Sequence, residues 1–378
     1  MRDLAREFAA QGHEPVVLVP DESLRRPWAL ETLGGIQVLR LRALPTRDIG
    51  YFWRTLTEFV LPWAMLRGLR KSPFRARRWD AVIWYSPSIF FGPLVTALKR
   101  PSKCRSYLIL RDIFPDWAVD LGLLKRGLAY RIFKKIERQQ HDAADIIGIQ
   151  APSNREYLVH LENKPGVSVE VLWNWLTPAP NIGCRIDVAC TPLAGRTIFV
   201  YAGNMGVAQG LDVLLELAAR LRDRVDIGFL FVGRGSEVPR LRAVAEDHAL
   251  KNILFYDEVD PEEIPGLLSQ CHVGLLALDP RHRTHNIPGK FLTYVQSGLP
   301  VLARINANND LVALIETEGV GRVDVGESLE SSQAIAEEMA DDITGRELMS
   351  SRGRALSRKL FSSTTAVKQI VESLSRHD

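Results

Sequence analysis

Short apolar runs rich in β-branched residues alternate with amphipathic stretches along the whole chain. The runs have the length of strands, and the stretches between them carry apolar residues at helical spacing. This alternation is typical of α/β proteins, in which helices cover both faces of a parallel sheet. The strands that it predicts are Glu14–Val19, Ile36–Leu41, Ala81–Trp84, Ser106–Leu110, Asp145–Ile149 and Val169–Leu172, followed by Thr197–Tyr201, Asp226–Val232, Asn252–Phe255, Val273–Ala277, Val301–Ala303 and Gly321–Val323.

The alternation is interrupted at Leu176–Pro192, a segment with three prolines and no periodic apolar signal. Such a segment is typical of a linker, and a chain of 378 residues is long enough for two domains. We therefore expect one domain over residues 1–176 and a second over residues 177–363. The amphipathic tail, residues 364–378, is expected to pack back on the first domain.

The chain begins within a predicted helix, Met1–Gln11, which leads through Gly12 to the first predicted strand. A Rossmann half starts instead with a strand and a glycine-bearing turn that feeds such a helix. We therefore expect the first strand of the first domain to be missing from this sequence, leaving a gap beside Glu14–Val19.

Composition adds three constraints. The four cysteines are scattered, which indicates reduced thiols, and no apolar run resembles a secretion signal or a spanning helix. Residues 1–181 carry 27 Lys and Arg against 18 Asp and Glu, or +9, whereas residues 182–378 carry 21 against 27, or −6. All eight tryptophans lie in the basic half. That half could meet an anionic or interfacial partner, or could hold ordinary core aromatics and solvated charge.

The strongest local motif is FVYAGNMGVAQG, over residues 199–210, followed by a helix. A strand, a glycine-rich loop and a helix N-terminus together bind phosphate, because unpaired N–H groups and the helix dipole point at the ligand. A turn that uses the same glycines for steric reasons remains open. Gly233-Arg234-Gly235 also follows a strand, at the end where parallel sheets bind ligands, but this motif is weak alone.

A third motif runs from His285 to Pro300, as a polar loop, a short helix that starts near Pro288 and ends at Gly298, and a strand. Lys290 lies in the first turn of this helix, where the dipole disfavours a cation unless an anion is bound. A solvated lysine is the alternative.

In order, YAGNMGVAQGLDVLLELA, FLFVGRGSEVPRL, NILFYDEVDPEEIPGLLSQCHVGLLAL and NIPGKFLTYVQSGLPVLA resemble the donor domain of retaining GT-B glycosyltransferases of family four. The likeness is greatest to the branch that resembles fucosamine transferases of surface-polysaccharide assembly, and it includes GHEPVVLV and LRDIFPDWAVDLGLL in the first half. It implies two Rossmann-like domains that face each other across a cleft. It also implies retaining, metal-independent transfer from a nucleotide sugar, a UDP-N-acetyl-amino sugar in our expectation, with no cofactor.

Three departures from that family concern the site. Its usual Arg and Lys in the first donor loop correspond to Asn204 and Gln209, and its two glutamates to His285 and Thr293. Its usual histidine is replaced by Arg111, next to Asp112. We assign catalytic roles to Arg111, Asp112 and Lys290, and donor binding to Gly203, Asn204, Gln209, Gly233, Arg234, His285, Asn286, Pro288, Gly289 and Thr293.

The acceptor side is indicated by Tyr51–Arg78, where a large apolar face with Trp53 and Trp63 runs into a basic cluster. Such a segment suits a helix lying on an anionic bilayer, although a core helix with a solvated basic end remains open. We expect a peripheral enzyme at the cytoplasmic, inner face of the membrane. Its acceptor would be a polyprenyl-diphosphate-linked sugar or another saccharide in lipopolysaccharide or surface-polysaccharide biosynthesis.

Two other functions remain open. A sugar-nucleotide 2-epimerase of two Rossmann domains would need acid and base carboxylates that the sequence does not reveal. A non-catalytic nucleotide-sugar-binding subunit is compatible with the replacements at Asn204, Gln209 and Thr293. Nucleic-acid binding is disfavoured, because no known binding module accompanies the basic residues.

Overall fold

The computed structural model describes residues 1–46, 49–86, 88–120, 122–161, 164–279, 287–326 and 328–376. The chain forms two compact units. Unit 1 comprises Met1–Trp173 and Ser363–Asp378, and unit 2 comprises Asn174–Ser362. The chain thus leaves unit 1 just before the expected boundary at residue 176, and it returns beside the expected start of the C-terminal helix.

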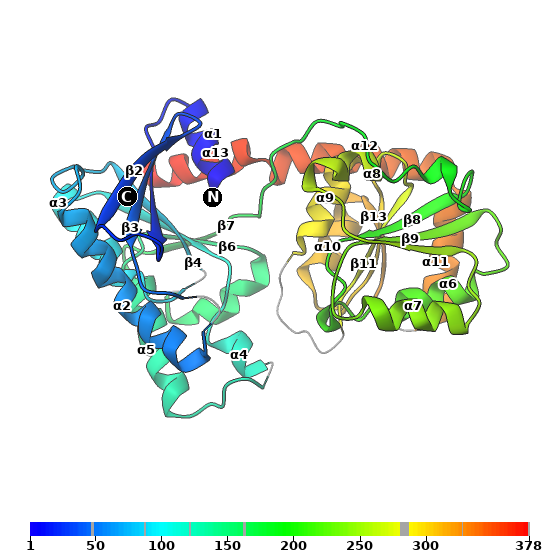
Figure 1. The fold of residues 1–378 in the computed structure, drawn as a ribbon, viewed down its shortest axis with the longest axis horizontal. Helices are drawn as coiled ribbons and strands as arrows, with labels where there is room; N and C mark the ends of the chain where they lie inside the picture. The colour runs from blue at the N-terminus through cyan, green and yellow to red at the C-terminus, as the bar shows by residue number, and fades with distance from the viewer. Residues whose placement is uncertain are drawn as a thin grey trace. The chain divides into compact units, whose positions relative to one another are not determined.

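Unit 1 contains two separate sheets, in the orders β1-β3-β2 and β4-β5-β6-β7 (Figure 1). All their pairings are parallel except β2 with β3, which form a hairpin around Gly34-Gly35, both at positive φ. The strand pattern missed β2, although two glycines between apolar runs are a hairpin signal. The strands are β1 (Val16–Asp21), β2 (Trp28–Leu33), β3 (Ile36–Arg42), β4 (Ala81–Ser86), β5 (Arg105–Leu110), β6 (Ile146–Ile149) and β7 (Ser168–Val171).

Within the described ranges, no strand joins β1 to β4. The first sheet is therefore interrupted beside β1, as we expected. The core positions of β1 reflect this, because Val16, Val17, Leu18 and Val19 all stay partly exposed, whereas Leu39 and Leu41 of β3 are fully buried.

The C-terminal helix, α13, belongs to unit 1 and packs beside α1. The Ser363 hydroxyl lies 3.3 Å from a Glu7 carboxylate oxygen, and the Gln369 amide donates to Glu170 at 3.0 Å. These contacts come from residues far apart in the sequence. The helices of unit 1 are α1 (Arg2–Ala10), α2 (Tyr51–Arg70), α3 (Gly92–Ser102), α4 (Asp116–Asp120), α5 (Leu128–Asp142) and α13 (Ser363–Ser375).

Unit 2 is built on one six-stranded parallel sheet in the order β10-β9-β8-β11-β12-β13, with helices on both faces (Figure 1). All strands expected in this half are present. The elements are β8 (Thr197–Ala202), α6 (Asp212–Arg220), β9 (Ile227–Val232), α7 (Val238–Asp247), β10 (Ile253–Tyr256), α8 (Ile264–Leu268), β11 (Val273–Ala277), α9 (Gly289–Ser297), β12 (Val301–Arg304), α10 (Asp310–Glu318), β13 (Gly321–Asp324), α11 (Leu329–Asp341) and α12 (Ile343–Leu360).

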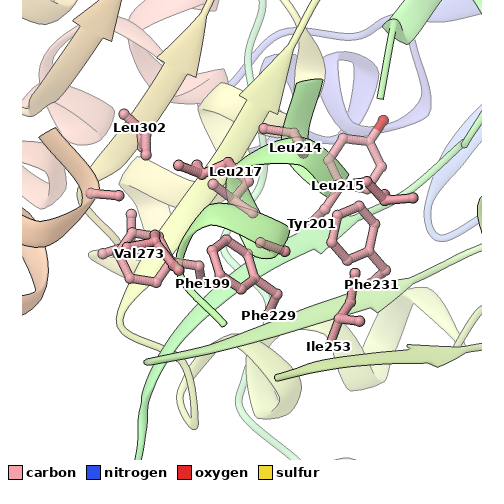
Figure 2. Close-up of a cluster of buried hydrophobic side chains, with 14 of the residues drawn as sticks. Phe199, Tyr201, Leu214, Leu215, Leu217, Phe229, Phe231, Ile253, Val273 and Leu302 are labelled. Carbon is pink, nitrogen blue, oxygen red and sulfur yellow. The ribbon is translucent and has the colours of Figure 1, made fainter. Parts of the chain in front are cut away.

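The core of unit 2 contains stacked aromatic rings at paired positions of β8 and β9 (Figure 2). The ring centroids of Phe199 and Phe229 lie 5.5 Å apart, and those of Tyr201 and Phe231 5.8 Å apart. Fully burying a large apolar side chain contributes about 1.5–3 kcal/mol. The stack therefore fixes the end of β8, where Tyr201 precedes the glycine loop.

Candidate functional site

Two glycine loops interlock where β8 and β9 end. A Cβ on Gly233 would lie 2.0 Å from the Gly203 carbonyl oxygen, and one on Gly235 would lie 2.1 Å from the Met205 carbonyl oxygen. The Met205 N–H donates to the Arg234 carbonyl at 2.7 Å. Only glycine fits at 233 and 235, because both also have φ near +150°. The loops thus form a rigid backbone surface at the end of the sheet where ligands bind.

The side chains of Asn204 and Gln209 close the first of these loops. The Gln209 carbonyl oxygen accepts from the Asn204 amide at 3.2 Å and from the Gly206 N–H at 2.9 Å. The structure therefore brings Asn204 and Gln209 together, as their assignment to one site requires. Neither supplies positive charge.

Lys290, the second residue of α9, lies across the first loop. A Cβ on Gly203 would come within 2.7 Å of Lys290 Cε, and the ammonium lies 4.9 Å from the centre of the Tyr201 ring. Burial lowers the pKa of Lys290. In the part of the chain that the structure describes, no carboxylate is within ion-pair distance of this ammonium, and desolvation is the only influence on its pKa. Lys290 is thus a half-buried cation with no carboxylate partner among the described residues, in the first turn of a helix that begins at Gly289. Helix N-termini and desolvated cations both favour anions.

Two tyrosines that the sequence reasoning missed position this site. The Tyr294 hydroxyl accepts from the Ala202 N–H at 2.9 Å, which ties α9 to the end of β8, and the Tyr201 hydroxyl donates to the Asn204 carbonyl at 2.7 Å. The Tyr294 ring fits because residue 274 has no side chain, since a Cβ there would lie 2.5 Å from the ring. Gly274 inside a strand was the available signal of this close approach.

The side chains of the remaining candidates for donor binding make no hydrogen bond with the first glycine loop among the described residues. Arg234 is 78% exposed and pairs with Glu258, at 3.1 Å and 3.2 Å, so it is not a free cation. The Thr293 hydroxyl donates to the Gly289 carbonyl one turn earlier in α9, at 3.2 Å. His285 and Asn286 lie outside the described residues.

Arg111 and Asp112, directly after β5, differ in exposure. Arg111 is 4% exposed, and its guanidinium donates to the carbonyls of Leu110 and Trp173 at 3.2 Å and 3.4 Å. Burial lowers its pKa to about 10, so it stays charged at neutral pH. Asp112 is exposed, but partial desolvation raises its pKa against the opposing effect of Arg111. Of the two side chains, only that of Asp112 is thus open to solvent.

Tyr85, near the end of β4, lies close to this pair and was also missed. Burial raises its pKa, and so does the Asp112 carboxylate. It is 37% exposed. The β4 and β5 strands pair Tyr85 with Ile109, two residues before Arg111, which explains why distant sequence positions meet.

One face of α2 is apolar and exposed. Trp53, Leu56, Val60 and Trp63 are each at least 42% exposed and recur at helical spacing, while the opposite face, with Leu61, Met65, Leu66 and Leu69, is buried. Arg67 and Arg70 continue the exposed stripe. The predicted core packing and the predicted apolar surface therefore coexist in one helix. Among the described residues, no helix is long and apolar enough to cross a membrane, and no group of three or more potential ligands could hold a metal ion.

Both halves of the chain match known domain families. Residues 1–175 match the glycosyl transferase 4-like domain, and residues 196–341 match the glycosyl transferases group 1 family. The chain is 26% identical over 255 residues to the colanic acid biosynthesis glycosyl transferase WcaI of Escherichia coli (strain K12), covering 64% of this chain and 61% of WcaI. It is 22% identical over 253 residues to the glycosyltransferase WbjE of Pseudomonas aeruginosa, covering 65% and 62%. The matches thus span about three fifths of these relatives.

A solved structure shares the fold. A UDP-forming α,α-trehalose-phosphate synthase from Burkholderia xenovorans superposes with a TM-score of 0.73 at 12% identity, over 99% of this chain and 96% of that one. The expected α/β fold of GT-B type, with two Rossmann-like domains, is therefore confirmed.

Proposed function

Because both units of this chain match glycosyltransferase domains, we propose that it transfers a sugar from a nucleotide sugar to an acceptor in the assembly of a surface polysaccharide or lipopolysaccharide. The 2-epimerase and the non-catalytic subunit are not favoured by these matches. They serve as alternative outcomes of the test.

The observation that carries the proposal is the position of the Lys290 ammonium beside the first glycine loop. A diphosphate brings about two negative charges, of which the N-terminus of α9 can offset about half a charge. The Lys290 ammonium, lying over Gly203 and Tyr201, supplies the cation that Asn204 and Gln209 do not. We propose UDP as the nucleotide and an N-acetyl-amino sugar as the transferred group. The UDP-forming synthase of the same fold is compatible with this nucleotide.

The chemistry that we propose is retaining and needs no metal or cofactor. Negative charge develops on the leaving diphosphate, so preorganised N–H donors and Lys290 contribute most to catalysis. Asp112, exposed beside Arg111, would contact the acceptor hydroxyl. We propose that the chain is related to the fucosamine-transferase branch of these enzymes.

The proposed acceptor is a polyprenyl-diphosphate-linked sugar at the inner face of the cytoplasmic membrane. The support is the exposed stripe of α2, where Trp53 and Trp63 lead into Arg67 and Arg70. Aromatic side chains favour the membrane interface, and the arginines favour anionic headgroups.

The test has two steps. Thermal shift with UDP, GDP and dTDP identifies the nucleotide, since a ligand at 100 times its Kd adds about 2.7 kcal/mol. The matching sugar nucleotides are then incubated with and without a polyprenyl-diphosphate-linked sugar, and the products and their anomeric configuration are determined. Sugar transfer supports the proposal, conversion of the donor without acceptor indicates an epimerase, and binding without turnover indicates a binding subunit.

A further inference from the structure

Helix α5 buries polar side chains where an ordinary packing helix would bury apolar ones. Glu137 is 3% exposed, and Gln140 and His141 are fully buried. Burying such groups costs free energy unless they are paired, so a buried polar face is expected to hold something in place. Its contacts lead to the ends of β4 and β5, where Tyr85, Arg111 and Asp112 lie.

One set of contacts fixes the segment after β5. The Lys134 ammonium bonds to one oxygen of Asp116 at 2.9 Å and also contacts Glu137, while the Tyr130 hydroxyl donates to the other oxygen of Asp116 at 2.8 Å. The Lys134, Asp116 and Glu137 side chains are at most 17% exposed. Asp116 starts α4, four residues after Asp112. Both of its carboxylate oxygens are therefore held by α5.

An aromatic contact reinforces the same segment. The ring of Phe114 packs edge-on against Phe133 of α5, with centroids 5.1 Å apart. Tyr130, Phe133, Lys134 and Glu137 recur at intervals of three and four residues, so they lie on one face of α5. Two residues that follow Asp112 in the chain, Phe114 and Asp116, are thus both held by α5.

A second set of contacts reaches the end of β4. The Gln140 amide donates to the Ser86 hydroxyl, in the last residue of β4, at 3.0 Å. A single helix therefore holds the ends of two neighbouring strands.

We propose that Lys134 is a positioning residue, which sets the Arg111–Asp116 segment for the acceptor by holding Asp116 against α5. The proposal rests on the proposed function, because it assigns the acceptor to Asp112. Its structural half, the anchoring of the segment, can be measured without turnover.

The experiment compares Lys134→Met and Lys134→Arg with Lys135→Met, a matched control at an exposed neighbouring lysine of the same helix. Amide hydrogen exchange is measured across unit 1, together with kcat, KM for the acceptor and the Kd of UDP. We expect faster exchange confined to residues 111–119 in Lys134→Met. We also expect kcat about tenfold lower with an unchanged Kd of UDP, and near-normal values in Lys134→Arg and Lys135→Met.

Two results would overturn the proposal. The first is unchanged exchange in residues 111–119 of Lys134→Met. The second is faster exchange throughout unit 1, which would show a purely structural role. If exchange changes locally but the wild type transfers no sugar, the proposed function fails while the anchoring by Lys134 stands.

Discussion

Lys290→Met separates a functional role of this lysine from a structural one. Methionine keeps an unbranched chain over Gly203 and Tyr201 but removes the ammonium. In the free protein the charge is desolvated at a helix N-terminus that disfavours cations, while the Tyr201 ring favours it. A cation–π contact contributes about 0.5–2 kcal/mol, so the opposing contributions nearly cancel. We expect the Tm of the free variant to stay within about 2 °C of wild type, given that 1 kcal/mol corresponds to about 2–4 °C for a domain of the size of unit 2, Asn174–Ser362.

Binding of UDP should change far more. Hydrogen bonds to charged groups contribute about 1.5–3 kcal/mol, so the Kd should rise about tenfold to a hundredfold. At a UDP concentration of 100 times the wild-type Kd, the stabilisation should fall from about 2.7 kcal/mol to about 0.4–1.4 kcal/mol. Turnover should fall about a hundredfold, as when one electrostatic donor is removed.

The assay is thermal unfolding with and without UDP, supported by calorimetric titration. Lys251→Met, on the exposed surface of unit 2, is the control. The reasoning is refuted if Lys290→Met loses several degrees of Tm while UDP still stabilises it fully, since Lys290 would then support the fold and not the anion.

Three further outcomes are expected. Replacing Arg70, Arg75 and Arg78 with Gln should weaken binding to anionic vesicles by about 1 kcal/mol per charge; Arg77 is spared because it pairs with Glu14 and lies over Trp79. Co-sedimentation measures this effect, and the control replaces Arg222, Lys251 and Lys359 with Gln. Equal vesicle binding by the two variants would contradict a membrane-binding role of α2. Burial raises the pKa of Glu137 to about 7, beyond what Lys134 offsets, so the folded state retains a proton that the unfolded chain loses above about pH 4.5. The free energy of unfolding should therefore fall as pH rises from about 4.5 to about 7, and over that window Glu137→Gln should become up to about 3 kcal/mol more stable relative to wild type. Urea unfolding at several pH values measures this difference. Parallel pH profiles of the two proteins would disprove it. Tyr294→Phe leaves the Ala202 N–H without its acceptor, so the free energy of unfolding should drop by about 1–3 kcal/mol. The control is Tyr256→Phe, because the Tyr256 hydroxyl has no hydrogen bond among the described residues. An equal drop in both variants would argue against an anchoring role of Tyr294.

The candidate site was only partly readable from the sequence. The glycines at 203, 233 and 235 and the lysine at 290 stand at the ends of predicted strands and at a helix start, so local pattern was enough to select them. The sequence did not show that Arg234 pairs with Glu258, or that the Arg111 guanidinium is buried against the Trp173 carbonyl. Those outcomes depend on which side chains other elements bring near.

What the sequence determined by itself is the order of strands and helices apart from β2, and the glycines of the two loops after β8 and β9. Hydrophobic periodicity and backbone sterics act over a few residues and leave a local record. Tertiary structure alone decided the contacts of Tyr294 with Ala202, of Lys134 with Asp116, and of Gln140 with Ser86. Each contact joins residues from different elements, and its energy depends on the packing that brings their atoms within reach. No local sequence pattern indicates that packing.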